Sequence, residues 1–560
     1  MLKAAIESRR AQVAEALVLS LTAAWVTHLV HKEELQESAA AVSLQAEHWL
    51  LQSATMSHVL FVLHVLGFSA ILWSIYRPQA PSRSLRAPYR QDRDAGLVVG
   101  CMLPPLVLLS RLLAGIYLED TFSCFTFFYA WTSISIGISL LFKVIVFGTV
   151  TSFSVNFLVD VVLLPVVFGL LSFKLLPRSF TVGEALLVAQ GIGLCAFDLL
   201  LVTINRLNEY DVVSLPPSVL HSWLIFDADR PDFVLALEVG MLGSLLVCVA
   251  LIPLLQSHGA PSPTAIMQPL SVYGSAKFVL TAAAVVGGVV YPWSCFLLQT
   301  WNPFAWLFDF LTESSSSLPL PLPTRFALMG YWTACLVILV PLFGFISNKF
   351  ALRNIVARKL FHLLVVLMLG PASLFDAPML SLSYGVALSV FCLVECVRAL
   401  SLPPFGRTIA KFMRSFIDHR EAGRVILTHS YLLLGCALPL WLVPSSSASS
   451  PLVMNAGVLA LGIGDAMGAV VGSRIGKHKI FGSKTVEGSV AVFITMVLAS
   501  ISLQNYHTRY FVNGDYTQVI LLTAAVFLTT VLEAATAQID NLVLPLFFYT
   551  TCNLVDCYRV

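Results

Sequence analysis

Long apolar runs alternate along this chain with short polar segments that are rich in arginine and lysine. A run of about 20 apolar residues is long enough to cross a membrane as a helix. In the first half such runs reach to about residue 30 and cover residues 56–76, 97–118, 121–153 (one or two spans), 155–173, 182–204, 233–255 and 277–298. Because backbone groups inside a bilayer must be satisfied within the segment, the pattern predicts an all-α polytopic transmembrane protein with about 14–16 spans.

The apolar runs of the second half distribute its polar segments between two membrane faces. The expected spans are residues 326–346, 360–375, 378–400, 425–443, 453–471, 490–503 and 519–533, followed by an apolar segment at 542–552. Counting the crossings places three basic loops on one face, together with Glu533 and Asp540; the loops are residues 349–359, 401–424 and 473–487. Loops rich in lysine and arginine favour the cytoplasmic side. We therefore expect this face to be cytoplasmic.

A segment rich in serine and proline, residues 314–323, separates the two halves. Serines make such a segment flexible, and alternating prolines favour extended backbone. We expect an N-terminal multi-span membrane region at residues 1–325 and a C-terminal multi-span region at residues 326–560 that carries the chemistry. Residues 301–311 are short and aromatic, which is typical of an interfacial or re-entrant piece.

Composition supports the membrane assignment and excludes some functions. Of the 560 residues 58% are hydrophobic and 11% are charged, whereas a soluble domain carries about 25% charged residues. The net charge of +2 gives no reason to expect a nucleic acid partner. The 11 cysteines include no C-x-x-C pair, so neither a zinc site nor a disulfide framework is indicated.

Residues 461–489 bring together glycines, an acid and several bases that no apolar run explains. Asp465 lies among glycines that recur every four residues, and the lysines follow within one loop. Small residues allow a backbone to approach a bulky anion, and lysine side chains then hold it. A neighbouring acid is where Mg²⁺ would bridge to phosphate oxygens. The stretch predicts a phosphate site at a membrane surface.

A simpler interpretation of the same residues stays open. Glycines spaced by four residues pack membrane helices closely, and lysines after a span are ordinary cytoplasmic flanks. The stretch is not a Walker A loop, because residues 472–477 are one residue short and His478 stands where Ser or Thr is needed. Asp465 is harder to explain structurally, since an acid near a membrane span is costly.

Several short motifs together resemble the signature of the polyprenol kinase family. They are Gly464-Asp465-Ala466, Gly472, Gly476-Lys477 and Lys484-Thr485-x-Glu487-Gly488-Ser489, with support from residues 427–435, from Arg358 to His362, and from Glu533, Gln538 to Asn541 and Pro545. The resemblance covers about residues 350–555, and the first 350 residues resemble the family only in being rich in spans. It implies that CTP donates its γ-phosphate to the terminal hydroxyl of dolichol. It also implies an endoplasmic reticulum membrane, with the nucleotide site facing the cytosol.

Phosphoryl transfer needs cations that neutralise the phosphates and an acid that holds Mg²⁺ or takes the acceptor's proton. The expected catalytic acids are Asp465, Glu533 and Asp540. Asp465 is the first candidate for the Mg²⁺ ligand, and its role as general base stays open. The expected CTP-binding residues are Gly464, Gly472, Gly476, Lys477, Lys479, Lys484, Thr485, Glu487, Gly488 and Ser489. For Arg358, Lys359 and His362, juxtamembrane anchoring and substrate contact are both open.

Two other protein classes are alternatives. A CTP:phosphatidate cytidylyltransferase is also polytopic, but its acidic, glycine-rich C-terminal signature does not follow Lys484. A polytopic transporter would use ionisable groups inside spans, such as Asp198 and Glu238. It would also be expected to show repeat symmetry between its halves, and no repeated motif is seen in this sequence.

Overall fold

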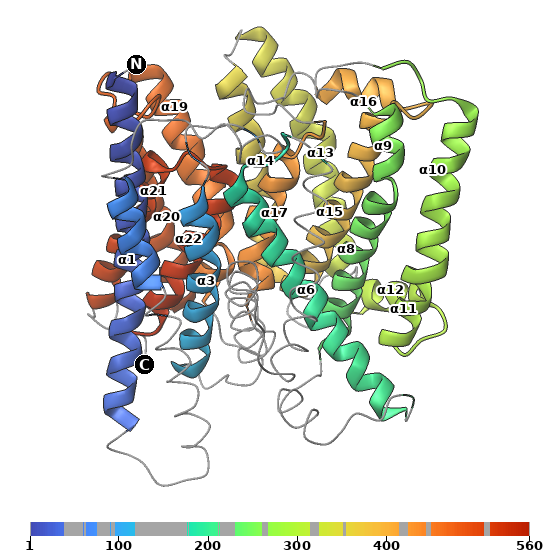
Figure 1. The fold of residues 1–560 in the computed structure, drawn as a ribbon, viewed down its shortest axis with the longest axis horizontal. Coiled ribbons are helices and arrows are strands. Elements are labelled where there is room, and N and C mark those ends of the chain that lie inside the picture. The colour runs from blue at the N-terminus through green and yellow to red at the C-terminus, as the bar shows by residue number, and fades with distance from the viewer. Residues whose placement is uncertain are drawn as a thin grey trace, which may run out of the picture.

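The computed structural model is helical in the part of the chain that it describes (Figure 1). That part comprises residues 2–37, 60, 63–74, 90, 94, 96–117, 176, 178–210, 212, 230–259, 267–313, 324–350, 354–413, 424–443, 450–508 and 516–558. Nine helices within it are long and apolar enough to cross a membrane, and three shorter apolar helices accompany them. The predicted all-α polytopic class is confirmed. The expected spans between residues 121 and 173, and the segment at 314–323, lie outside the described residues, so the total of 14–16 spans stays a prediction.

The helices of the first half follow the apolar runs. They are α1 (Leu2–Glu37), α3 (Leu97–Tyr117), α6 (Val182–Glu209), α8 (Asp232–Ala250), α9 (Ile252–His258), α10 (Val272–Val285), the π-helix η1 (Val286–Val290), α11 (Tyr291–Leu297) and α12 (Pro303–Thr312). The run expected as one span at 233–255 is divided at Leu251, two residues before Pro253. A proline is accepted in the first turn of a new helix, where its missing N–H has no partner to lose.

The helices of the second half also follow the apolar runs. They are α13 (Thr324–Lys349), α14 (Asn354–Phe375), α15 (Ala377–Ala399), α16 (Gly406–Met413), α17 (Thr428–Trp441), α18 (Pro451–Met454), the π-helix η3 (Val458–Asp465), α19 (Ala466–Ile475), α20 (Val486–Thr508), α21 (Thr517–Ala535) and α22 (Asp540–Asp556). Helix α15 begins with a side-chain cap, because the Asp376 carboxylate accepts a hydrogen bond from the Met379 N–H at 2.9 Å. The N-terminus of the chain, α16 and α19 lie toward the same end of the molecule (Figure 1).

The last helix, α22, is buried along almost its whole length. Every residue from Asn541 to Asp556 is buried, and α22 packs against α3, α17 and α21. Its apolar residues contact protein on all sides, and the expectation that residues 542–552 end in or on the membrane stays a prediction. Helices α1 and α3 from the start of the chain share this core with α21 and α22 (Figure 1).

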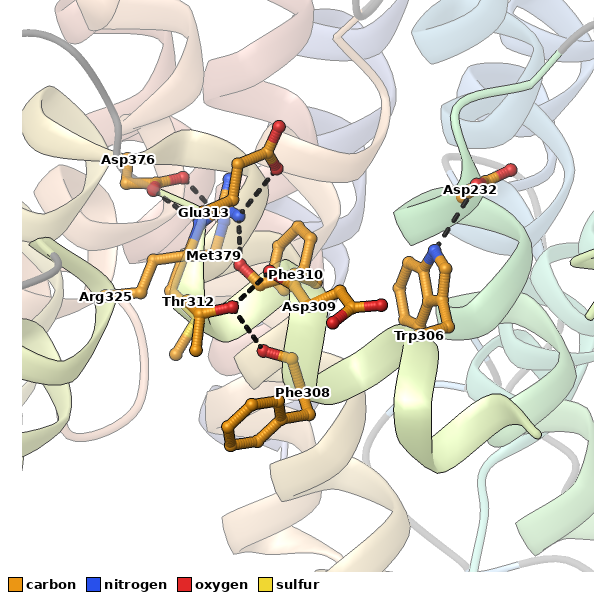
Figure 2. Close-up of polar contacts among 10 residues, drawn as sticks. All are labelled: Asp232, Trp306, Phe308, Asp309, Phe310, Thr312, Glu313, Arg325, Asp376 and Met379. Atoms are coloured by element: carbon orange, nitrogen blue, oxygen red, sulfur yellow. Dashed lines mark hydrogen bonds and ion pairs between the residues drawn. The ribbon is translucent and has the colours of Figure 1, made fainter.

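A short helix, α12, occupies the segment expected to be interfacial or re-entrant. A buried arginine at the start of α13 holds it in place (Figure 2). Arg325 Nε donates to Asp376 Oδ2 at 2.8 Å, and its guanidinium lies 3.7 Å from the centroid of the Phe310 ring. Glu313 pairs with the same guanidinium at 3.3 Å. The arginine therefore joins α12 to α15, while Phe304 on the outer side of α12 is exposed.

Candidate active site

Asp465 is the last residue of the π-helix η3 and directly precedes α19. Its side chain is buried, with 6% of the residue exposed. π-helical segments are rare and occur frequently at functional sites. A buried carboxylate is tolerated only where charged or hydrogen-bonding groups surround it. Asp465 therefore requires partners from neighbouring helices.

Helix α14 supplies those partners. Lys359 Nζ forms an ion pair with Asp465 Oδ2, and His362 Nε2 lies 3.3 Å from the same oxygen. Residues three apart on a helix share a face, so Lys359 and His362 reach the acid together. Gly462 makes the approach possible, because a Cβ atom there would clash with Val366 of α14. Lys359 and His362 thus contact the expected catalytic acid, while the Arg358 side chain lies outside the described residues. Substrate contact by this motif stays a prediction.

A second pair of acids flanks the turn between α21 and α22. Glu533 lies near the end of α21, and Asp540 is the first residue of α22. Lys484 Nζ forms an ion pair with Glu533 Oε1 and lies 3.2 Å from Asp540 Oδ2. The Glu533 side chain is 5% exposed and the Lys484 side chain 26%. Lys484 thus reaches from the polar loop into a buried pair of carboxylates.

The acids around Lys484 keep its side chain charged. Burial disfavours its ammonium group, but Asp540, Glu533 and Asp465 outweigh burial and raise the pKa of Lys484 above its ordinary value. The cause is the concentration of negative charge on one side of the lysine. Lys484 therefore remains a cation wherever the three acids are ionised.

The three acids expected from the sequence converge. One carboxylate oxygen from each of Asp465, Glu533 and Asp540 lies within 4.8 Å of the other two. Carboxylate oxygens are the ligands that Mg²⁺ prefers, and one or two of them commonly hold it beside substrate phosphates. Three carboxylates face two lysines here, so the cluster keeps an excess of negative charge. The residues present fit a divalent cation.

The loop between α19 and α20 folds into a tight turn that aims Lys484 inward. The Lys484 N–H donates to the Phe481 carbonyl at 3.0 Å, and the Val486 N–H donates to the His478 carbonyl at 2.8 Å. Gly482 has a φ of +58°, a conformation that glycine adopts at little cost. Among the described residues there is no β-strand, and this loop contains one isolated bridge, between Lys479 and Thr485.

Glu487 holds this loop. Its carboxylate accepts a hydrogen bond from the His478 N–H at 3.2 Å and lies 2.7 Å from His478 Nδ1. Lys477 and Lys479 are exposed on the loop, and in the described part of the chain neither forms an ion pair with the three acids. That these three residues bind CTP stays a prediction.

The glycines pack helices. A Cβ atom at Gly464 would lie 2.7 Å from Met496, and one at Gly468 would lie 2.6 Å from Val492. A Cβ atom at Gly472 or at Gly476 would lie 3.1 or 2.6 Å from the Thr485 hydroxyl. A Cβ atom at Gly488 would lie 3.0 Å from the Gly468 carbonyl oxygen. This close contact of α19 with α20 corresponds to the helix-packing interpretation. That Gly464, Gly472, Gly476 and Gly488 also contact CTP stays a prediction.

The two hydroxyl residues of the motif lie at the start of α20. Thr485 Oγ1 accepts a hydrogen bond from the Gly488 N–H at 3.2 Å and so caps the helix. Within the described residues the Ser489 hydroxyl is buried and has no hydrogen-bond partner. Thr485 therefore serves the helix terminus, and a contact between Ser489 and CTP stays a prediction.

Comparison with known proteins agrees with the motifs. The sequence model of one family, Dolichol kinase, matches residues 130–481. The chain is 32% identical over 404 residues to the dolichol kinase of Homo sapiens, covering 69% of this chain and 68% of the human protein. It is 32% identical over 384 residues to Dolichol kinase EVAN of Arabidopsis thaliana, covering 67% and 64%, and 29% identical over 256 residues to the dolichol kinase of Saccharomyces cerevisiae, covering 45% of each. No solved structure matches the chain.

The matched range corrects one part of the sequence interpretation. We expected the resemblance to begin near residue 350, but the family match begins at residue 130. Because the first half shows no short polar motif of its own, only comparison along the whole chain reveals its similarity. The match spans more than half of the chain, and the human relative is aligned over more than two thirds of both proteins. This multi-pass membrane protein is therefore a member of the dolichol kinase family.

Proposed function

We propose that this protein is a CTP-dependent dolichol kinase, which transfers the γ-phosphate of CTP to the terminal hydroxyl of dolichol and releases dolichyl phosphate for protein glycosylation. The names of its relatives support dolichol as the acceptor and a nucleotide as the donor. The resemblance of its motifs to the polyprenol kinase family supports CTP. One observation of the site carries the proposal: Asp465, Glu533 and Asp540 converge beside Lys484.

The cluster suits an acceptor that stays in the bilayer. Asp465 lies within the apolar segment Val458–Ile475, whereas Lys484 lies in the polar loop that follows it. A polyisoprenol would keep its chain among the lipids and present its hydroxyl where the segment meets the loop. The three acids would then meet the lipid hydroxyl from one side and the nucleotide phosphates from the other.

The residues divide the chemistry as follows. Asp465, Glu533 and Asp540 would hold Mg²⁺, which neutralises the phosphate charge when bound. One of these carboxylates, with Asp465 as the first candidate, accepts the proton of the acceptor hydroxyl. Lys484 and Lys359 offer ammonium groups to the phosphate oxygens, since both already form ion pairs with the acids that would hold the metal. The exposed lysines Lys477 and Lys479 attract the nucleotide to the loop.

We further propose that the protein resides in the endoplasmic reticulum membrane with this site toward the cytosol. The basic segments at the N-terminus, around α16 and after α19 support that orientation, since they lie toward one end of the molecule (Figure 1). CTP is available on the cytosolic side.

A transfer assay in membranes that express the chain tests the proposal. Dolichol is supplied with γ-labelled CTP, in parallel with γ-labelled ATP, and phosphatidic acid is supplied with α-labelled CTP. We expect label in dolichyl phosphate from CTP alone, lost in the Asp465→Asn variant and on chelation of divalent cations. Label in dolichyl phosphate from ATP alone would show that ATP, not CTP, is the donor. Label only in CDP-diacylglycerol would identify a cytidylyltransferase. No label in either lipid, with folded protein present, would reject the kinase.

A further inference from the structure

A buried hydrogen bond joins the first half of the protein to the turn that carries two of the three acids. Thr181 Oγ1 donates to Gln538 Oε1 at 2.7 Å, although the two residues are 357 positions apart. Neither residue is more than 1% exposed. Gln538 lies between Glu533 and Asp540, in the turn of residues 536–539 that belongs to no helix. The bond therefore acts on the part of the backbone that sets how these two acids face each other.

Thr181 is itself held firmly. It caps α6 in a reciprocal arrangement, in which the Glu184 N–H donates to Thr181 Oγ1 at 3.2 Å and the Thr181 N–H donates to Glu184 Oε2 at 3.1 Å. Arg90 closes the arrangement, because its guanidinium donates to Glu184 Oε1 at 2.6 Å and its N–H donates to the Phe180 carbonyl at 2.7 Å. The Thr181 hydroxyl thus accepts one hydrogen bond and donates another, and both partners are buried.

Two glycines allow the backbones to approach Gln538 this closely. Gly96 has a φ of +71°, and a Cβ atom there would clash with the Gln538 side chain. A Cβ atom at Gly183 would in turn clash with the Gly96 carbonyl. Gln538 is therefore contacted from the first half by Gly96 and by Thr181. On the other side its N–H donates to Thr536 Oγ1 at 3.2 Å.

We propose that Thr181 and Gln538 are positioning residues of the phosphoryl-transfer site, and that the first half of the chain acts in the reaction by fixing the turn between Glu533 and Asp540. This inference rests on the proposed kinase function. Neither residue lies among the reacting groups, so each acts through the acids. A shift of about 1 Å in a catalytic group can lower turnover about a hundredfold, and a turn outside regular helix depends on such side-chain bonds for its position.

Three variants of Thr181 and Gln538 test the inference. Thr181→Val keeps the shape of the side chain and removes its hydrogen bonds, whereas Thr181→Ser retains the hydroxyl. Gln538→Met removes the acceptor at similar length. Thr333→Val is the matched control, because Thr333 is exposed on α13 and bonds only to the Met329 carbonyl of its own helix. Each purified protein is assayed for kcat, for the KM of CTP and for its thermal unfolding midpoint.

We expect kcat to fall about ten- to a hundredfold in Thr181→Val, with the KM of CTP little changed and the unfolding midpoint lowered only modestly by the lost helix cap. Thr181→Ser should restore most of both losses. Wild-type kcat in Thr181→Val overturns the inference, and so does a rise in KM at unchanged kcat. If Thr181→Val does not fold, Gln538→Met decides by the same criteria. An inactive wild-type protein would instead reject the proposed function, which separates the two failures.

Discussion

Lys359 forms an ion pair with Asp465 although 106 residues separate them in the sequence. The lysine side chain is 14% exposed and the aspartate 8%. Removing one member of a buried ion pair leaves an uncompensated charge, and the cost exceeds what the intact pair contributes. The pair therefore couples the position of α14 to the acid that we place at the centre of the reaction.

The first prediction concerns Asp465. Asp465→Asn keeps the size of the side chain and removes its charge, so it should lower kcat by about two to four orders of magnitude if Asp465 is the general base. The measurement is steady-state transfer of labelled phosphate to dolichol. Asp309→Asn, an exposed position on α12, is the control and should behave as wild type. Near-normal turnover in folded Asp465→Asn would remove its catalytic role.

Lys359 should matter for stability as well as for turnover. Lys359→Met should lower the free energy of unfolding by about 3 kcal/mol, because it leaves Asp465 buried without its lysine. Combining it with Asp465→Asn should recover part of that loss, since the unpaired charge is then absent. Unfolding in detergent measures both effects, with Lys349→Met at an exposed lysine of α13 as control. Equal stability of the single and double variants would show that the pair is not coupled.

Lys484 should act mainly on the nucleotide. Lys484→Ala should raise the KM of CTP about ten- to a hundredfold, the effect of losing a charge-assisted hydrogen bond. The CTP dependence of the initial rate measures this effect, and Lys411→Ala on the exposed side of α16 is the control. An unchanged CTP dependence would count against a contact between Lys484 and the phosphates.

The raised pKa of Lys484 predicts how stability depends on pH. A lysine whose pKa is higher in the folded protein contributes stability that is fully present below the ordinary lysine value of about 10.4. The contribution is lost only as the pH rises through the higher folded-state value. The unfolding midpoints of wild type and Lys484→Arg should therefore run in parallel from about pH 6 to about pH 9. A divergence within that window would mean that Lys484 loses its proton there.

Gly435 should be intolerant of any side chain. A Cβ atom at this position of α17 would clash with the Asn541 carbonyl oxygen in the first turn of α22. Gly435→Ala should therefore displace the helix that begins with Asp540 and reduce both stability and kcat. Gly330→Ala on α13 is the matched control, because nothing lies within 4 Å of a Cβ there and alanine favours helix. Wild-type activity in Gly435→Ala would show that α22 can move without harm.

Much of this architecture could be predicted from the sequence because its signals are local. Apolar runs locate the helices, and counting crossings predicts Glu533 and Asp540 on the face of the three basic loops, with Asp465 close to it. The glycine spacing is ambiguous in sequence, since phosphate contact and helix packing demand the same small residue. Only the fold shows that Gly468 faces Val492. The bond between Thr181 and Gln538 has no local signal, because it depends on how distant helices pack.

The π-helix that ends at Asp465 makes the backbone conformation of its segment part of the site. Residues Val458–Asp465 contain more residues per turn than an α-helix would. Converting the same residues to α-helix would rotate Asp465 by on the order of 100° relative to the preceding turns. The carboxylate would then face away from Lys359, with every side chain of the site still present. A substitution that favours regular α-helix in this segment would therefore inactivate the enzyme without altering any residue of the site.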